Sequence, residues 1–204
     1  METGRLEAFA DGVFAIAATL LILDVSADAR GGALGHAVTR AWPEYVTYAV
    51  AFLTIGIMWI NHHTCMRQID RVDRTFLVLN VALLMCISFV PFPTRLIGDH
   101  LRDHGLRAAA LTYGVTLTLT SIFFGLFWFY AAFGNRLIAS DADPRAVVGI
   151  TRAFRPGSLI YGAATLTALW SPKVAVALFG LIAVFYVLES SLFARSEPVF
   201  REGA

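Results

Sequence analysis

The chain has 204 residues, of which 57% are hydrophobic and only 15% are charged, whereas soluble domains carry about 25% charged residues. This composition is typical of an integral membrane protein and disfavours a soluble enzyme, a disordered tail, a collagenous fibre and a small disulfide-stabilised protein. Sixteen basic and 15 acidic residues give a formal net charge of +1, so we expect no nucleic-acid partner.

Six apolar stretches follow one another along the chain, separated by short polar or proline-containing links. A helix of about 20 residues crosses about 30 Å of hydrocarbon, and each stretch approaches that length. The predicted spans are 8–24, 44–62, 76–98, 108–133, 154–170 and 174–193. We therefore expect an all-α integral membrane protein in which residues 1–204 form a single domain of six transmembrane helices.

Prolines and aromatic residues add detail to these spans. Pro43 fits the opening turn of the second span, Pro91 and Pro93 end or kink the third, and Ser171-Pro172 makes the turn between the last two. The fourth span ends in an aromatic group that we expect to face lipid or the membrane interface: Phe123, Phe124, Phe127, Trp128, Phe129 and Tyr130.

The basic residues are unevenly divided between the two sides of this six-span arrangement. Basic residues near span ends favour the cytoplasm, so the richer side predicts the orientation. Six residues lie on the poorer side: Arg30, Arg40, Arg95, Arg102, Arg107 and Lys173. Ten lie on the other: Arg5, Arg67, Arg71, Arg74, Arg136, Arg145, Arg152, Arg155, Arg195 and Arg201. We expect both termini to be cytoplasmic.

The first span has carboxylates near both of its ends. Only twelve residues separate Asp11 from Asp24, and they span about 18 Å as a helix. To cross the bilayer, this helix must carry at least one carboxylate to membrane depth, where ionisable groups face protein or a water-filled cavity. We therefore expect the first span to lie inside the assembly.

An apolar stripe runs along this helix. Ile16, Leu20 and Leu23 are spaced four and three residues apart, and Thr19 lies beside them. Two interpretations remain open from spacing alone. The stripe either faces water as a hydrophobic gate or packs against neighbouring helices, as most apolar helical stripes do.

A second group of residues predicts a polar network at the inner end of the first span. Arg5 and Asp11 bracket the start of the helix, with Phe9 between them, and Arg5 can either pair with Asp11 or snorkel at the helix end. Asn80, in the third span, is expected to bond between helices. The second span ends in residues whose donors and acceptors can hold the first helix through Arg5 or Asp11, namely Trp59, Asn61 and His62. Simple interfacial placement, or a pH sensor at His62 and His63, are the alternatives.

His100 and His104 form a third candidate site in the link between the third and fourth spans. They are four residues apart, with Asp99 and Asp103 adjacent, a pattern that fits either an external zinc or proton site or a solvated loop. Two histidines without a third fixed ligand favour the loop, and we expect no resident metal.

The segment Arg5-Leu-Glu-Ala-Phe9-Ala10-Asp11 resembles the Arg-x-x-x-Phe-Ser-Asp motif of the transmembrane protein 175 family of potassium channels. Trp59-Ile-Asn61-His62-His63 and Pro91-Phe-Pro93-Thr94 also resemble segments of the prokaryotic members. Ala10 stands where the family usually has serine, which removes one hydroxyl from the motif. One copy of the motif in six spans resembles the bacterial form.

The resemblance implies a specific assembly and function. Four subunits would surround a central pore lined by the first helices, with Ile16, Leu20 and Leu23 as hydrophobic rings and Thr19 as a polar ring. The expected function is a leak channel in the cell membrane, selective for potassium modestly over sodium. Its expected partners are further copies of itself, monovalent cations and the lipid bilayer, with no cofactor besides the permeant potassium ions.

A secondary or proton-coupled transporter is the alternative, with Asp11, Asp24 and the histidines binding substrate or protons. The sequence contains no phosphate loop, nucleophile elbow, zinc-helix motif or dinucleotide fingerprint, so we do not expect an enzyme.

Overall fold

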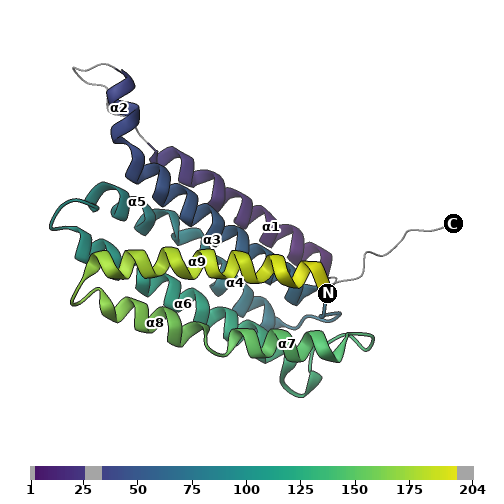
Figure 1. Cartoon of the computed structure of the whole chain (residues 1–204). Coiled ribbons are helices and arrows are strands. Elements are labelled where there is room, and N and C mark those ends of the chain that lie inside the picture. Colours follow the sequence, from purple (N-terminus) through teal and green to yellow (C-terminus); the bar gives the residue numbers. More distant parts are fainter. Residues whose placement is uncertain (1–2, 26–33, 197–204) are drawn as a thin grey trace.

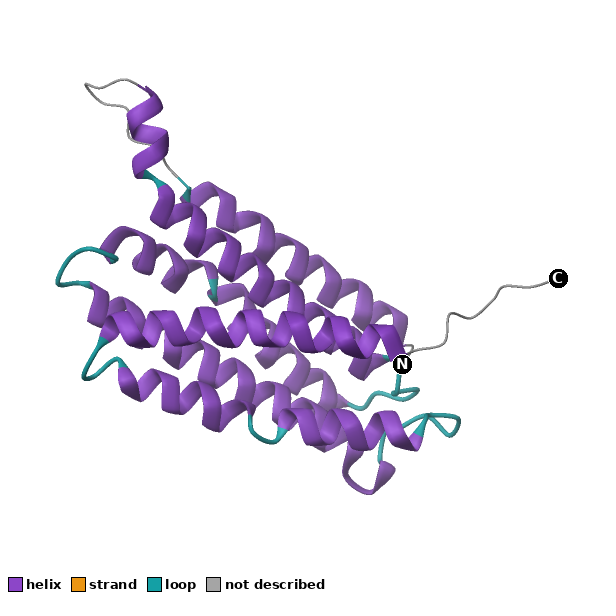
Figure 2. Ribbon diagram, in the orientation of Figure 1, coloured by secondary structure: helices purple, strands orange, loops and turns teal. Residues whose placement is uncertain are grey.

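A computed structural model describes residues 3–25 and 34–196 of the chain, with side chains up to residue 188 except those of Asp24, Leu34, His36 and Ala37. Arg30 and Arg201 lie outside the described residues, as do the side chains of Asp24, Glu189 and Arg195. Within the described part the secondary structure is helical throughout, apart from one isolated bridge between Ile69 and Ile138 (Figure 2).

Long helices run side by side along a common direction and make up the body of the molecule (Figure 1). In chain order, the elements are α1 (Thr3–Leu20), η1 (Leu21–Asp24), α2 (Leu34–Arg40), α3 (Trp42–Met66), α4 (Arg74–Phe89), α5 (Pro91–His100), α6 (Leu106–Ala132), η2 (Phe133–Asn135), α7 (Pro144–Phe154), α8 (Gly157–Thr167) and α9 (Pro172–Ser196). Helix α1 packs against α3 and α4, whereas α6 packs against α4, α5 and α8. Helix α9 lies over α3 and α8.

Four segments of the described chain are long and apolar enough to cross a membrane: Thr3–Leu23, Trp42–Met66, Arg74–His100 and Leu106–Asn135. They correspond to the first four predicted spans. The third is bent where Pro91 begins α5, because proline cannot donate the backbone hydrogen bond that would continue α4. The predicted helix opening at Pro43 is also present in α3.

The fifth predicted span, 154–170, differs from the structure. Helix α7 begins ten residues earlier, at Pro144, and the chain bends at Arg155 and Pro156 before α8. Both residues keep right-handed helical backbone angles, so α7 and α8 form a kinked pair of 24 residues, about 36 Å long if helical throughout. The sixth span corresponds to α9, whose 25 residues roughly complete the six-span count.

The two ends of this bundle collect different links (Figure 1). Helix α1 begins and α9 ends at one end, where the links α3–α4 and α6–α7 also lie, and we call it the inner end. At that end the two links are joined, since Asp70 N donates to Leu137 O at 3.3 Å and Ala139 N donates to Gln68 O at 2.9 Å. The opposite, outer end carries α2 and the links α5–α6 and α8–α9.

Candidate pore face and its polar contacts

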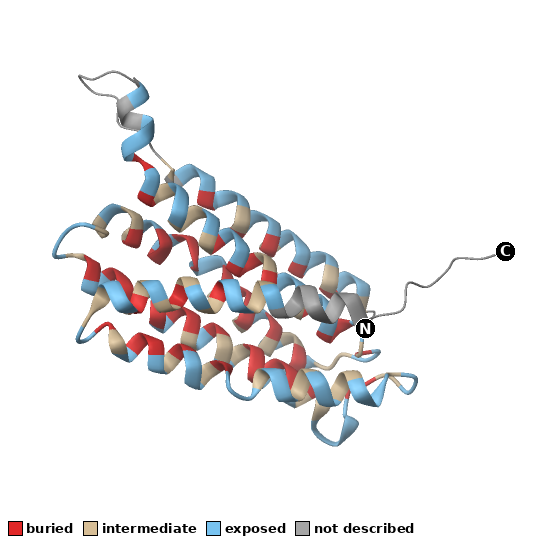
Figure 3. Cartoon of the chain, in the orientation of Figure 1, coloured by how far each residue is buried: buried red, intermediate tan, exposed pale blue. Residues whose placement is uncertain are grey.

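Helix α1 has one buried face and one exposed face (Figure 3). The buried face follows a spacing of three and four residues, continues into η1 and packs against α3 and α4: Leu6, Ala10, Phe14, Ala17 and, in η1, Leu21. On the other face, Ile16 is 61% exposed, Leu20 43% and Leu23 74%. The predicted stripe is therefore uncovered within the single chain and does not pack into its core.

Thr19 lies on the same exposed face, and its hydroxyl is tied to its own helix. Thr19 Oγ1 lies 2.9 Å from the carbonyl oxygen of Ala15 and 3.0 Å from that of Ile16, so the hydroxyl proton is shared between them. The oxygen lone pairs remain free to accept from water or to contact a cation. This geometry suits a polar ring that presents oxygen between two apolar ones.

The inner end of α1 is held by a hydrogen bond that the sequence predicted in part. Trp59 Nε1 on α3 donates to Asp11 Oδ1 at 2.8 Å, and the Trp59 ring stacks on His63. Arg5 is exposed and forms no ion pair with Asp11 or with any other residue that the structure describes. Phe9 is 57% exposed, on the side of α1 that carries the apolar stripe. The Arg5–Asp11 pairing considered above is therefore absent from the single chain.

His62 forms a separate buried contact behind α1. Its Nε2 lies 2.8 Å from Asn80 Oδ1 on α4, and both residues are at most 2% exposed. The amide oxygen accepts, so Nε2 carries the proton in this arrangement. The expectation that Asn80 bonds between helices is confirmed. Asn61, by contrast, makes no hydrogen bond through its side chain among the described residues.

Aromatic rings enclose the His62–Asn80 pair. Phe127 of α6 stacks on the imidazole with ring centroids 5.2 Å apart, and Phe14 of α1 lies 5.5 Å away on a tilted ring. The pair thus connects α3 and α4 directly beside the buried face of α1. Sequence reasoning identified His62 and Asn80 singly, but the rings that enclose them carry no sequence signal.

The aromatic group of the fourth span is placed differently from the prediction. Phe127 and Trp128 are completely buried, and Phe124 is 7% exposed. Trp128 Nε1 donates to Thr151 Oγ1 at 2.9 Å, and Phe124 lies against Phe154 of α7. The predicted lipid-facing belt is therefore wrong for these three residues, because α7 covers Phe124 and Trp128, whereas Phe127 lies against His62 of α3 and Phe76 of α4.

Asp73 joins two helices at the inner end. It caps the start of α4 by accepting from Phe76 N at 2.9 Å, and it also accepts from the Tyr130 hydroxyl at 2.7 Å. These bonds, with Arg136 nearby, hold the pKa of the Asp73 carboxyl below its usual range. No feature of the sequence had indicated this role.

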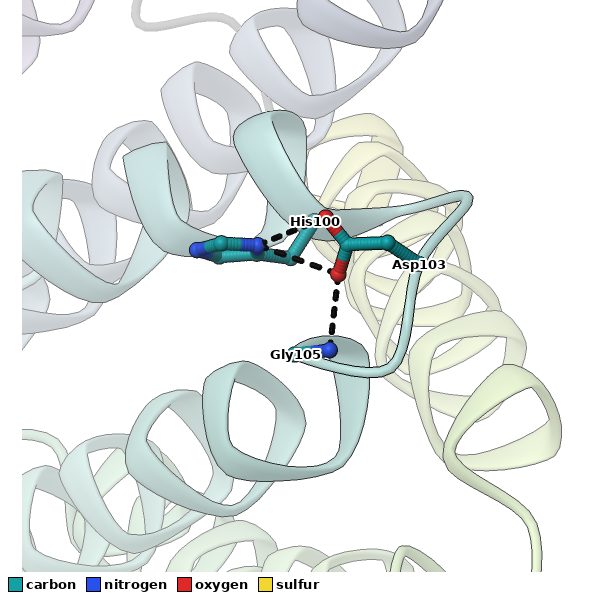
Figure 4. Close-up of polar contacts among 3 residues, drawn as sticks. All are labelled: His100, Asp103 and Gly105. Carbon is teal, nitrogen blue, oxygen red and sulfur yellow. Dashed lines mark hydrogen bonds and ion pairs between the residues drawn. The ribbon is translucent and has the colours of Figure 1, made fainter.

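At the outer end, His100 faces a carboxylate (Figure 4). His100 Nδ1 lies 2.9 and 3.1 Å from the two oxygens of Asp103, and Asp103 Oδ1 accepts from Gly105 N at 2.7 Å. The hydrogen bonds from His100 and then from Gly105 lower the pKa of Asp103. Across the described part of the chain, no three potential metal ligands gather, and His104 remains exposed.

Comparison with known proteins agrees with this arrangement. Residues 5–91 match a family model described as the endosomal/lysosomal potassium channel TMEM175. A potassium channel of Streptomyces collinus is 40% identical over 189 residues, which cover 91% of each chain. A potassium channel of Chamaesiphon minutus is 36% identical over 194 residues, covering 93% of this chain and 96% of the relative.

A solved structure extends the similarity to the whole fold. The crystal structure of a lysosomal potassium-selective channel TMEM175 homolog from Chamaesiphon minutus superimposes with a TM-score of 0.83 at 33% identity. The match covers 92% of this chain and 97% of that one. With 40% identity to a potassium channel over 91% of each chain and a shared helical membrane fold, the chain belongs to the TMEM175 channel family.

Proposed function

We propose that this protein is a potassium channel, modestly selective for potassium over sodium, with the exposed face of α1 as the lining of its pore. The observation that carries the proposal is that Ile16, Leu20 and Leu23 are uncovered on a helix whose opposite face is buried. The names of the relatives from Streptomyces collinus and Chamaesiphon minutus support potassium as the ion. The proposed function requires no cofactor and no enzymatic step.

The apolar stripe supplies a physical basis for modest selectivity. Apolar side chains do not replace the water that an ion loses in a constriction, so passage favours the ion that is less costly to dehydrate. Potassium is larger than sodium and holds its water less tightly. Thr19 oxygens between the Ile16 and Leu20 levels would offer partial compensation.

The proposal requires several copies of the chain, because one chain contributes only one α1 to a ring. Closed cyclic symmetry places the same face of every copy on one axis. We propose a homotetramer in the cell membrane, with Phe9, Ile16, Thr19, Leu20 and Leu23 facing that axis. The excess of arginine at the inner end of the bundle favours a cytoplasmic location for that end and for both termini.

The test is a recording from purified protein in a planar bilayer with potassium on one side and sodium on the other. We expect discrete openings whose reversal potential is shifted toward the potassium equilibrium potential. A flux that saturates with substrate and requires a proton gradient, without openings, would instead support a transporter.

Two variants locate the constriction. Ile16→Asn and Leu23→Asn should each raise the conductance and reduce the discrimination between potassium and sodium, because an amide replaces apolar surface. Leu166→Asn is the matched control, since Leu166 is an exposed apolar residue on α8. Unchanged conductance and selectivity in both α1 variants would reject this pore face.

A further inference from the structure

Helix α7 and the kink that follows it carry three arginines on one exposed side. Arg145, Arg152 and Arg155 are all exposed, whereas Val147 and Phe154 of the same helix pack against the core. Spacings of seven and three residues keep the three arginines on one side of a helix. This side is therefore strongly cationic.

Contacts with α6 place the end of α7 and the kink after it at membrane depth. Trp128 Nε1 bonds to Thr151, the Phe124 ring lies 5.5 Å from that of Phe154, and a Cβ on Gly157 would lie 2.7 Å from Ser121 Oγ. Ser121 is 15 residues from Leu106 and 14 from Asn135, the two ends of that span. The backbone of Arg155, between Phe154 and Gly157, therefore lies close to the middle of the span, and Arg152 and Arg145 lie about 4.5 and 15 Å nearer the inner interface along the helix.

No carboxylate of the described chain neutralises these guanidinium groups. Residues 144–171 contain no aspartate or glutamate. Asp143 caps α7 by accepting from the backbone N of Arg145 at 2.8 Å, and none of the three arginines forms an ion pair within the part that the structure describes. Intramembrane arginines are costly unless they reach an anion, and the planar guanidinium binds phosphate with two parallel hydrogen bonds.

An apolar groove lies beyond the kink, along α8. It has a volume of about 220 Å³ and lies between α8 and α9, lined by Ile160, Leu178, Leu181, Ile182, Phe185 and Tyr186. Ile160 is five residues beyond Arg155, about 7.5 Å along a helix. A cationic side and an apolar groove further along the same helical path match the two parts of a phospholipid, its phosphate and its acyl chain.

We propose that Arg145, Arg152 and Arg155 bind the phosphate of an anionic phospholipid whose acyl chain occupies the α8–α9 groove. The lipid neutralises the arginines at the kink and covers the junction between α7, α8 and α9. This site is separate from the α1 face and does not depend on which ion the protein conducts.

The test is native mass spectrometry of the full-length protein in detergent, titrated with phosphatidylglycerol. We expect Arg145→Gln/Arg152→Gln/Arg155→Gln to weaken binding about 100-fold, because each arginine near a membrane surface contributes roughly a fivefold change in affinity for anionic lipid. The triple lysine variant keeps the charge but loses the paired guanidinium hydrogen bonds, so its affinity should fall between those of the unchanged protein and the glutamine variant, and it provides the readout if the glutamine variant folds poorly. The matched control is Arg40→Gln/Arg107→Gln/Lys173→Gln, which removes three exposed charges from the outer end and should bind normally.

Further ligands test each part of the site. Phosphatidylcholine should bind at least tenfold more weakly than phosphatidylglycerol, and inorganic phosphate should not compete at equal concentration. Leu181→Trp, which fills the groove, should weaken phosphatidylglycerol binding with all three arginines intact. Equal binding by the inner and outer triple glutamine variants, or full competition by inorganic phosphate, would overturn the proposal.

Discussion

On one side of α1, Phe14 and its neighbours are enclosed by α3 and α4, whereas on the other side Ile16 and Leu23 have no cover within the chain. Both sides are apolar, so hydrophobicity alone does not distinguish them. The difference lies in what surrounds each side, since the buried one meets the rings and the His62–Asn80 pair of its own bundle. One face of the helix thus stabilises the fold, and the other remains free to form the proposed pore lining.

The largest expected difference between the two faces of α1 is in the free energy of unfolding, when one side chain on each face is truncated to alanine. Phe14→Ala leaves a cavity beside His62 and should lower the free energy of unfolding by about 3 kcal/mol. Ile16→Ala should change it by less than about 0.5 kcal/mol, because Ile16 is 61% exposed. Denaturant unfolding of both variants in detergent, followed by tryptophan fluorescence, measures the difference. Equal losses would show that both faces carry the fold.

Trp59→Phe tests whether the hydrogen bond between Trp59 and Asp11 holds α1 in its orientation against α3. Removing the indole N–H breaks the 2.8 Å bond to Asp11 but preserves an aromatic ring, so the free energy of unfolding should fall by about 1–2 kcal/mol. Because Asp11 precedes the apolar stripe on the same helix, the variant should also change open probability in bilayer recordings.

Asp11→Asn is the companion variant for this contact. It keeps an oxygen acceptor for the indole but removes the charge, so its effect on stability should be smaller than that of Trp59→Phe. If Trp59→Phe leaves both stability and open probability unchanged, this hydrogen bond does not position α1.

Much of the helix order follows directly from the sequence. Apolar runs locate the first four spans, and Pro43 and Pro91 mark a helix start and a bend because proline lacks the backbone N–H. The sequence predicts that the fifth span begins at residue 154, since Arg145 and Arg152 make the preceding turns polar. The structure continues the helical path through these residues because Phe154 and Thr151 pack on α6.

The candidate site could also be predicted only in part from the sequence. The spacing of Ile16, Leu20 and Leu23 predicts a common stripe, but only packing shows that this stripe is uncovered. In α6, Phe124, Phe127 and Trp128 have no polar neighbours that mark an outward face, so their burial against α3, α4 and α7 has no signature in the sequence. Contacts such as Tyr130–Asp73, 57 residues apart, depend on tertiary structure alone.

The smallest expected effect is a loss of stability at low pH. It should arise at the start of α4, which supports α1, and not on the exposed face of α1. The pKa of Asp73 is lowered in the folded protein, so its contribution to stability is complete above the usual aspartate pKa of about 4 and is lost as pH falls through the lower folded value. Below about pH 4 we expect the cap of α4 to weaken by about 1 kcal/mol.

Asp73→Asn tests the source of this acid sensitivity. Asparagine can still cap α4 but does not titrate, so unfolding measured between pH 5 and pH 2.5 should depend less on pH in this variant. Tyr130→Phe removes one of the two hydrogen bonds and should reduce the dependence only partly. An unchanged dependence in Asp73→Asn would assign the acid sensitivity to other carboxylates, among them Asp103, whose pKa is also lowered. Because Asp73 supports α4 and not the exposed face of α1, ion selectivity should stay constant over the pH range in which the protein remains folded.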